Sequence, residues 1–105
     1  METPNLSYIE ELSGDDKEFQ ERMISIIKAE LPEEIDTYME TIKSKDYKET
    51  AQSVHKIKHK ITILGLEKTY FIAEKYENDL NEGDASFHKD FLKILEMMVS
   101  FLNQL

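Results

Sequence analysis

Residues 47–65 read YKETAQSVHKIKHKITILG, and this stretch decides the fold. Its apolar residues recur at steps of three and four, which places them on one face of a helix: Tyr47, Ala51, Val54, Ile57, Ile61 and Leu64. Gly65 follows where a helix C-terminus favours a left-handed residue, and Leu66 can make the apolar contact that often accompanies it. The segment predicts an amphipathic helix over 47–64 that buries one face.

Helical periodicity continues on both sides of this segment. Upstream, a turn at 13–16 precedes an apolar stripe that runs to about residue 43, and Pro32 inside it indicates either one bent helix or two short collinear ones. Downstream, helices are expected from about 67 to 80 and from 86 to 105. The core positions expected in these segments are Phe19, Met23, Ile26, Ile27, Leu31, Ile35, Tyr38, Met39, Ile42, Tyr70, Phe71, Ala73, Tyr76, Leu80, Phe87, Phe91, Ile94, Leu95, Met98, Phe101, Leu102 and Leu105.

The remaining pattern completes the fold prediction. Apolar residues between 6 and 12 indicate a short helix that covers one end of the molecule, and no segment alternates like a strand. Short connections favour antiparallel neighbours. We therefore expect an all-α protein: an antiparallel up-down four-helix bundle with a short additional N-terminal helix, forming a single domain over 1–105. This domain is either a stand-alone protein or a part of a larger kinase.

Composition narrows the classes of function. Thirteen basic residues face 22 acidic ones, and the net charge of −9 argues against a nucleic-acid partner. Cysteine is absent, and neither an export signal nor a membrane span is evident, which together predict a cytoplasmic protein. No spare apolar face is marked, so a monomer is expected. Residues 43–60 nevertheless contain six lysines against two acidic residues. This basic segment is either chance solvated charge or a site for an anionic group or acidic partner.

The face of the 47–64 helix opposite the core is polar, and its stripe contains Lys48, Gln52, His55, His59 and Thr62. His55 is therefore expected in water, with Lys56, Lys58 and Lys60 around it, and Lys56 and Lys60 are themselves expected in solvent. Such a histidine is either an ordinary surface residue or a nucleophile toward a phosphoryl group, because a neutral imidazole offers one ring nitrogen with a free lone pair. The lysines favour the second interpretation, since they would stabilise negative charge during transfer.

Residues 54–65, VHKIKHKITILG, resemble the signature of histidine-containing phosphotransfer (HPt) domains. That signature has a phosphoaccepting histidine, an apolar residue two positions later, lysine three later, a small residue four later, and a Leu-Gly pair at nine and ten. The matching positions are His55, Ile57, Lys58, Leu64 and Gly65. The resemblance extends upstream through 12–15 and 31–34 and downstream through 73–77, which is nearly the whole chain.

The resemblance implies a phosphocarrier of a two-component phosphorelay rather than an enzyme. His55 would accept a phosphoryl group from the aspartyl phosphate of one receiver domain and pass it to the aspartate of another, and Lys58 would steady the phosphate. The residues expected to bind the receiver are Gln52, Lys56, His59, Lys60 and Thr62. The chain would need no cofactor of its own, because no metal-binding carboxylate set accompanies His55, and Mg²⁺ would come from the receiver.

His59 departs from the family pattern, which often has glycine there. Its imidazole could narrow partner choice, donate to the phosphate or weaken transfer. An alternative function is therefore a pseudo-HPt adaptor that binds receivers without accepting phosphate. His55 and His59 also have the i, i+4 spacing at which two imidazoles can grip one zinc or nickel ion, but no third ligand is evident and no metal site is predicted. His88 is expected to be solvated or partly packed and receives no role.

Overall fold

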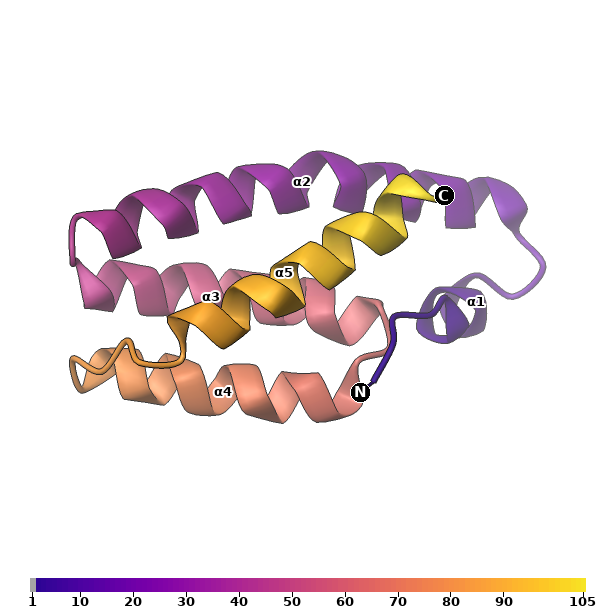
Figure 1. The fold of residues 1–105 in the computed structure, drawn as a ribbon. Helices are drawn as coiled ribbons and strands as arrows, with labels where there is room; N and C mark the ends of the chain where they lie inside the picture. Colours follow the sequence, from indigo (N-terminus) through magenta and orange to yellow (C-terminus); the bar gives the residue numbers. More distant parts are fainter. Residues whose placement is uncertain (1) are drawn as a thin grey trace.

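The computed structural model describes residues 2–105, which form five α-helices and no strand. The helices are α1 (Ser7–Ser13), α2 (Lys17–Lys43), α3 (Tyr47–Ile63), α4 (Glu67–Asn81) and α5 (His88–Asn103). In Figure 1, α2, α3 and α4 lie side by side in alternating directions, α5 crosses them obliquely, and α1 covers one end. The predicted all-α bundle with a short N-terminal helix is confirmed. Met1, the first residue of the predicted domain, lies outside the described part.

Helix boundaries follow the local sequence. The Asp16 carboxylate accepts a hydrogen bond from the Phe19 backbone N–H at 3.0 Å and caps α2, and Asp46 caps α3 in the same way through the Glu49 N–H at 3.3 Å. Of the two alternatives for Pro32, one helix is observed, since α2 continues through it. None of these helices is long and apolar enough to cross a membrane.

The connection between α3 and α4 is fixed by glycine and by the N-terminal segment. Gly65 has a φ of +75°, a backbone conformation that residues with a side chain rarely adopt. A Cβ at this position would lie 2.5 Å from the Asn5 side chain. The Asn5 backbone N–H donates to the Leu64 carbonyl at 2.8 Å. The Glu2 carboxylate accepts from the backbone N–H groups of Lys68 and Thr69 at 2.9 and 2.8 Å, so a residue far away in sequence caps α4.

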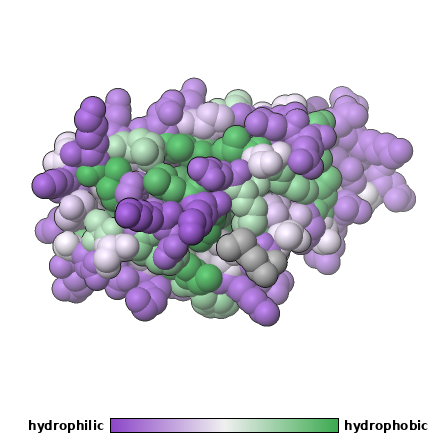
Figure 2. Space-filling model, in the orientation of Figure 1, coloured by the Kyte–Doolittle hydropathy of each residue, from purple (hydrophilic) through white to green (hydrophobic). Residues whose placement is uncertain are grey.

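The core lies between the inward faces of the helices, and most of the expected positions contribute to it. Five expected core residues are instead exposed, with Phe71 the most exposed at 67%: Phe19, Ile26, Met39, Phe71 and Leu105. Phe71 lies two positions after the buried Thr69 and two before the buried Ala73, which turns it to the opposite side of α4. Figure 2 shows apolar patches among the hydrophilic side chains on one face. The apolar stripes were therefore read too broadly in α2 and α4.

A buried polar cluster joins α2, α4 and α5. The Tyr38 hydroxyl lies 2.6 Å from that of Tyr76 and 2.8 Å from Nδ1 of His88, and both tyrosine rings pack on Phe91. Burial, followed by the hydrogen bond with Tyr76, raises the pKa of Tyr38. His88 is thus partly packed, and it helps to hold α5 across the bundle.

Candidate functional site

The outer side of α3 presents the predicted polar stripe to solvent. Gln52, His55, Lys56, His59 and Thr62 are all exposed, and the His55 side chain retains 55% of its accessible surface. The inner side of the same helix buries Val54, Ile57 and Ile61 completely. The helix face was therefore assigned correctly, and the fully buried inner side anchors the backbone that carries the exposed imidazole.

Glu77 of α4 holds one ring nitrogen of His55. Nδ1 of His55 lies 3.3 Å from Oε2 and 3.4 Å from Oε1 of Glu77. A carboxylate accepts hydrogen bonds and cannot donate them, so this contact assigns the proton to Nδ1. In the neutral ring, Nε2 then carries the free lone pair. The arrangement orients the imidazole and leaves one nitrogen available as a nucleophile.

Lys58 shares the same carboxylate. Its Nζ lies 2.8 Å from Glu77 Oε1 and 5.2 Å from the centroid of the Tyr70 ring, and only 7% of its side chain is exposed. Lys58 was expected to contribute to a positive field around His55. It lies next to the site as expected, but Glu77 balances its charge and receives bonds from both residues.

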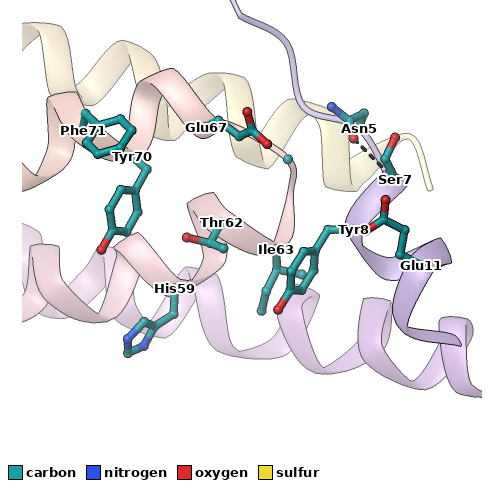
Figure 3. Close-up of a pocket in the computed structure, with 11 residues that line it drawn as sticks. Asn5, Ser7, Tyr8, Glu11, His59, Thr62, Ile63, Glu67, Tyr70 and Phe71 are labelled. Atoms are coloured by element: carbon teal, nitrogen blue, oxygen red, sulfur yellow. Dashed lines mark hydrogen bonds between the residues drawn. The ribbon is translucent and has the colours of Figure 1, made fainter.

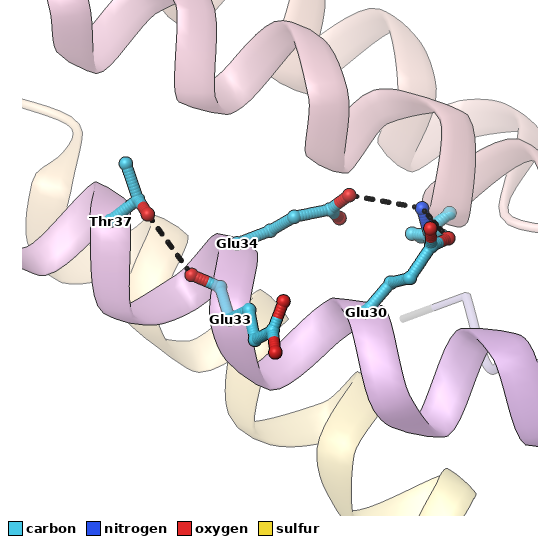
Figure 4. A network of polar contacts seen from close by, with 5 residues as sticks. Glu30, Glu33, Glu34 and Thr37 are labelled. Carbon is cyan, nitrogen blue, oxygen red and sulfur yellow. Dashed lines mark hydrogen bonds and ion pairs between the residues drawn. The ribbon is translucent and has the colours of Figure 1, made fainter.

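Lys60 does not belong to the exposed stripe, and the expectation that it lies in solvent is wrong. Its side chain is 10% exposed and bonds Glu34 at 3.0 Å and Glu30 at 3.1 Å, both on α2 (Figure 4). Burial lowers the pKa of Lys60, but the hydrogen bonds and charges of Glu34 and Glu30 outweigh burial and leave it raised. Lys60 therefore ties α3 to α2.

His59 stands directly beside His55. The two rings are 5.3 Å apart between centroids and meet edge to face at 71°. On its other side His59 lines a broad groove bounded by α1, α3 and α4, shown in Figure 3, together with Tyr8, Thr62, Tyr70 and Phe71. A second hollow flanks His55 and is lined by Lys48, Ala51, Gln52, Lys56, Glu77 and Asn81. His55 and His59 thus border two adjoining depressions.

Sequence reasoning missed Glu77 as a site residue, although a signal for it exists. Glu77 lies four residues after Ala73 and three before Leu80, both of which are fully buried. A carboxylate at an inward-facing position of an amphipathic helix requires a partner, because an unpaired buried charge is costly. The basic stretch on α3 could have supplied that partner.

Within residues 2–105, no group of three or more histidine, aspartate or glutamate side chains is arranged to hold a metal ion. Comparisons with protein-family models, with curated proteins and with solved structures find no match for this chain. The fold and the site alone therefore describe the protein: it is an all-α bundle with a solvent-exposed histidine that is oriented by a carboxylate from the neighbouring helix.

Proposed function

We propose that this chain is a histidine phosphotransfer protein of a two-component phosphorelay. His55 accepts a phosphoryl group from a receiver-domain aspartyl phosphate and passes it to another receiver aspartate, in the cytoplasm and as a monomer. One observation carries the proposal: the His55 ring is exposed, and Glu77 binds its Nδ1, which leaves Nε2 as the nucleophile. The HPt-like motif at 54–65 supports it independently.

The chemistry follows from this geometry. The Nε2 lone pair attacks phosphorus, an N–P bond forms, and the bond between phosphorus and the aspartyl oxygen breaks, with its electron pair returning to the receiver carboxylate. The phosphorylated ring keeps its proton on Nδ1 and so gains a positive charge, which the Glu77 carboxylate offsets. The second transfer reverses these steps: a receiver carboxylate attacks phosphorus, and Nε2 recovers its lone pair.

Catalysis of both steps is assigned to the receiver. Phosphoryl transfer usually requires a divalent metal near the phosphoryl oxygens. The part of the chain that the structure describes groups no three potential ligands for such an ion, and Glu77 is engaged by Lys58 and His55. We propose that Mg²⁺ and its carboxylates belong to the receiver, and that this chain supplies the nucleophile.

The surroundings of His55 suit a docked protein. Exposed apolar side chains line the groove beside His59, namely Tyr8 and Phe71. Exposed polar side chains surround His55 itself, including Gln52 and Lys56. An apolar patch next to a polar site is typical of an interface. We assign this surface to the receiver, with Lys60 no longer part of it.

A second candidate function is a pseudo-HPt adaptor that binds receivers without accepting phosphate. Two observations favour it: the His59 ring packs against the His55 ring, and Lys58 forms an ion pair with Glu77. The free Nε2 of His55 and the HPt-like motif favour the carrier. The two functions make different predictions about covalent label.

The deciding experiment incubates the protein with purified receiver domains that carry ³²P on their aspartate. The carrier acquires acid-labile label, and His55→Gln abolishes it while leaving the helical circular dichroism signal and receiver binding intact. His59→Gly serves as the matched control on the same stripe and should retain transfer at an equal or higher rate. Receiver binding without label on the wild type would identify the adaptor. Label on His55→Gln at the wild-type rate would show that the phosphoacceptor is another residue.

A further inference from the structure

We propose that His59 holds the phosphoryl group carried by His55, the task that the HPt resemblance gives to Lys58. This inference rests on the proposed function and concerns the same site. It names His59 as a positioning residue that binds the phosphoryl oxygens while the group waits for its acceptor. Three observations carry it: the state of Lys58, the exposure of His59, and the contact between the two imidazole rings.

Lys58 is already committed to other contacts. Its ammonium group bonds Glu77 at 2.8 Å and lies over the Tyr70 ring, and only 7% of the Lys58 side chain is exposed. To reach a phosphoryl group on the outward Nε2 of His55, it would have to leave Glu77 and enter solvent. Glu77 would then lose a charged partner at the moment when the ring of His55 also needs its carboxylate. Both contacts therefore favour keeping Lys58 where it is.

His59 is free to do what Lys58 is not. Its side chain is exposed, and no hydrogen bond or ion pair to another residue in the range 2–105 engages its ring. An imidazole presents at least one N–H donor in either tautomer and two when protonated. With the ring centroids 5.3 Å apart, a phosphoryl group on His55 projects from the neighbouring ring and can turn about its N–P bond to offer an oxygen to that donor. A glycine at position 59 would offer no donor.

Such a bond should slow loss of the phosphoryl group. Hydrolysis breaks the N–P bond as a water oxygen attacks phosphorus, which returns the electron pair to Nε2 and releases inorganic phosphate and a proton. The transition state is loose and metaphosphate-like, so its equatorial oxygens carry less charge than those of the intact phosphoryl dianion. A donor on these oxygens therefore stabilises the phosphohistidine more than the transition state. The chain then stores the group longer between partners.

The test separates the donor of His59 from its bulk. Phosphoramidate, a small donor with a P–N bond, phosphorylates the full chain without any receiver. Nε2 attacks phosphorus, the P–N bond of the donor breaks, and its nitrogen, which is already protonated, leaves as ammonia with the electron pair of that bond. After the donor is removed, phosphorus NMR follows the decay of the phosphohistidine. His59→Phe keeps an aromatic ring against His55 but has no donor, and one lost hydrogen bond should shorten the half-life about three- to tenfold. His59→Gln restores a donor and should stay within about twofold of wild type.

A matched control and two outcomes complete the design. Lys93→Gln removes an exposed cation from α5, away from His55, and should leave the half-life within about twofold, because the Lys93 side chain is 72% exposed and pairs with Asp90 on its own helix. An unchanged half-life in His59→Phe, or an equal shortening in Lys93→Gln, overturns the assignment of His59 while the proposed function stands. A wild-type protein that takes no label, or label that survives His55→Gln, overturns both.

Discussion

Replacing Glu77 with glutamine should weaken both the fold and the phosphorylation of His55. The substitution keeps the size of the side chain and one carbonyl oxygen, but it removes the negative charge and replaces the second acceptor oxygen with an NH2 donor. Glu77 now bonds Lys58 Nζ at 2.8 Å and His55 Nδ1 at 3.3 Å. A pair of opposite charges forms a hydrogen bond about twice as strong as a neutral pair. Lys58 keeps its charge in the variant, so about 1 kcal/mol is expected to be lost from this contact.

The effect on the fold depends on the burial of Lys58. Only 7% of this side chain is exposed, so its ammonium group cannot exchange Glu77 for water without moving. We expect the free energy of unfolding to fall by about 1–2 kcal/mol and the Tm by about 5–10 °C. Urea denaturation followed by circular dichroism measures it. Asp79→Asn on the same helix is the matched control, since its partner Lys75 is 80% exposed and the change should stay below about 0.5 kcal/mol.

The effect on His55 is separate and smaller. Phosphorylation places a positive charge on the ring, and the glutamine oxygen compensates it less than a carboxylate does. The exposed contact is worth about 1 kcal/mol, so the initial rate of labelling by phosphoramidate should fall about fivefold. Asp79→Asn should react like wild type. If Glu77→Gln loses stability as expected but reacts at the wild-type rate, then Glu77 is a partner of Lys58 only, and the orientation of His55 has been misread.

Two further predictions concern the other lysines of α3. Lys60→Met should lower the free energy of unfolding by about 2–3 kcal/mol, because it leaves the Glu34 carboxylate without its charged partner. Adding Glu34→Gln should recover part of that loss, and urea denaturation measures both variants. Additive losses from the two substitutions would contradict the proposed ion cluster. Lys56→Glu should slow receiver association about two- to threefold at low salt and less at high salt, as measured by stopped flow. Lys93→Glu on α5 is the control and should leave the association rate unchanged. Association rates that do not depend on salt would argue against electrostatic docking at His55.

The fold was predictable because the positions and inward faces of helices depend on the spacing of apolar residues within each segment. The spacing of apolar residues in 47–64 fixes which side of α3 faces inward, and the Asp16 and Asp46 caps and the glycine at 65 mark where helices begin and end. Contacts that cross the bundle were not predictable in the same way. Glu2 caps α4 from the far end of the chain, and nothing near Thr69 in sequence indicates it.

The candidate site was predictable in part for the same reason. The azimuth of His55 on its helix could be read from the sequence, and its exposure is confirmed. The burial and the partners of each lysine could not be predicted so directly, because a long side chain at the edge of the apolar face can turn toward solvent or toward a neighbouring helix. Lys60 follows the buried Ile57 by three positions, which places it on the side that faces α2. The carboxylates on α2 and α4 then determine which lysines turn inward to form ion pairs.

The basic stretch of α3 therefore acts mainly inside the bundle. Lys58 pairs with α4 and Lys60 with α2, so two of the three lysines around His55 fasten the helix on either side and leave their charge largely compensated. The local excess of lysine that the sequence shows is thus a poor measure of the electrostatic potential at the surface around His55. The exposed groups there include the ammonium groups of Lys48 and Lys56 and the imidazoles of His55 and His59. In such a site, hydrogen bonds from neighbouring rings matter more for holding a phosphoryl group than the lysine count suggests, which is the role assigned to His59.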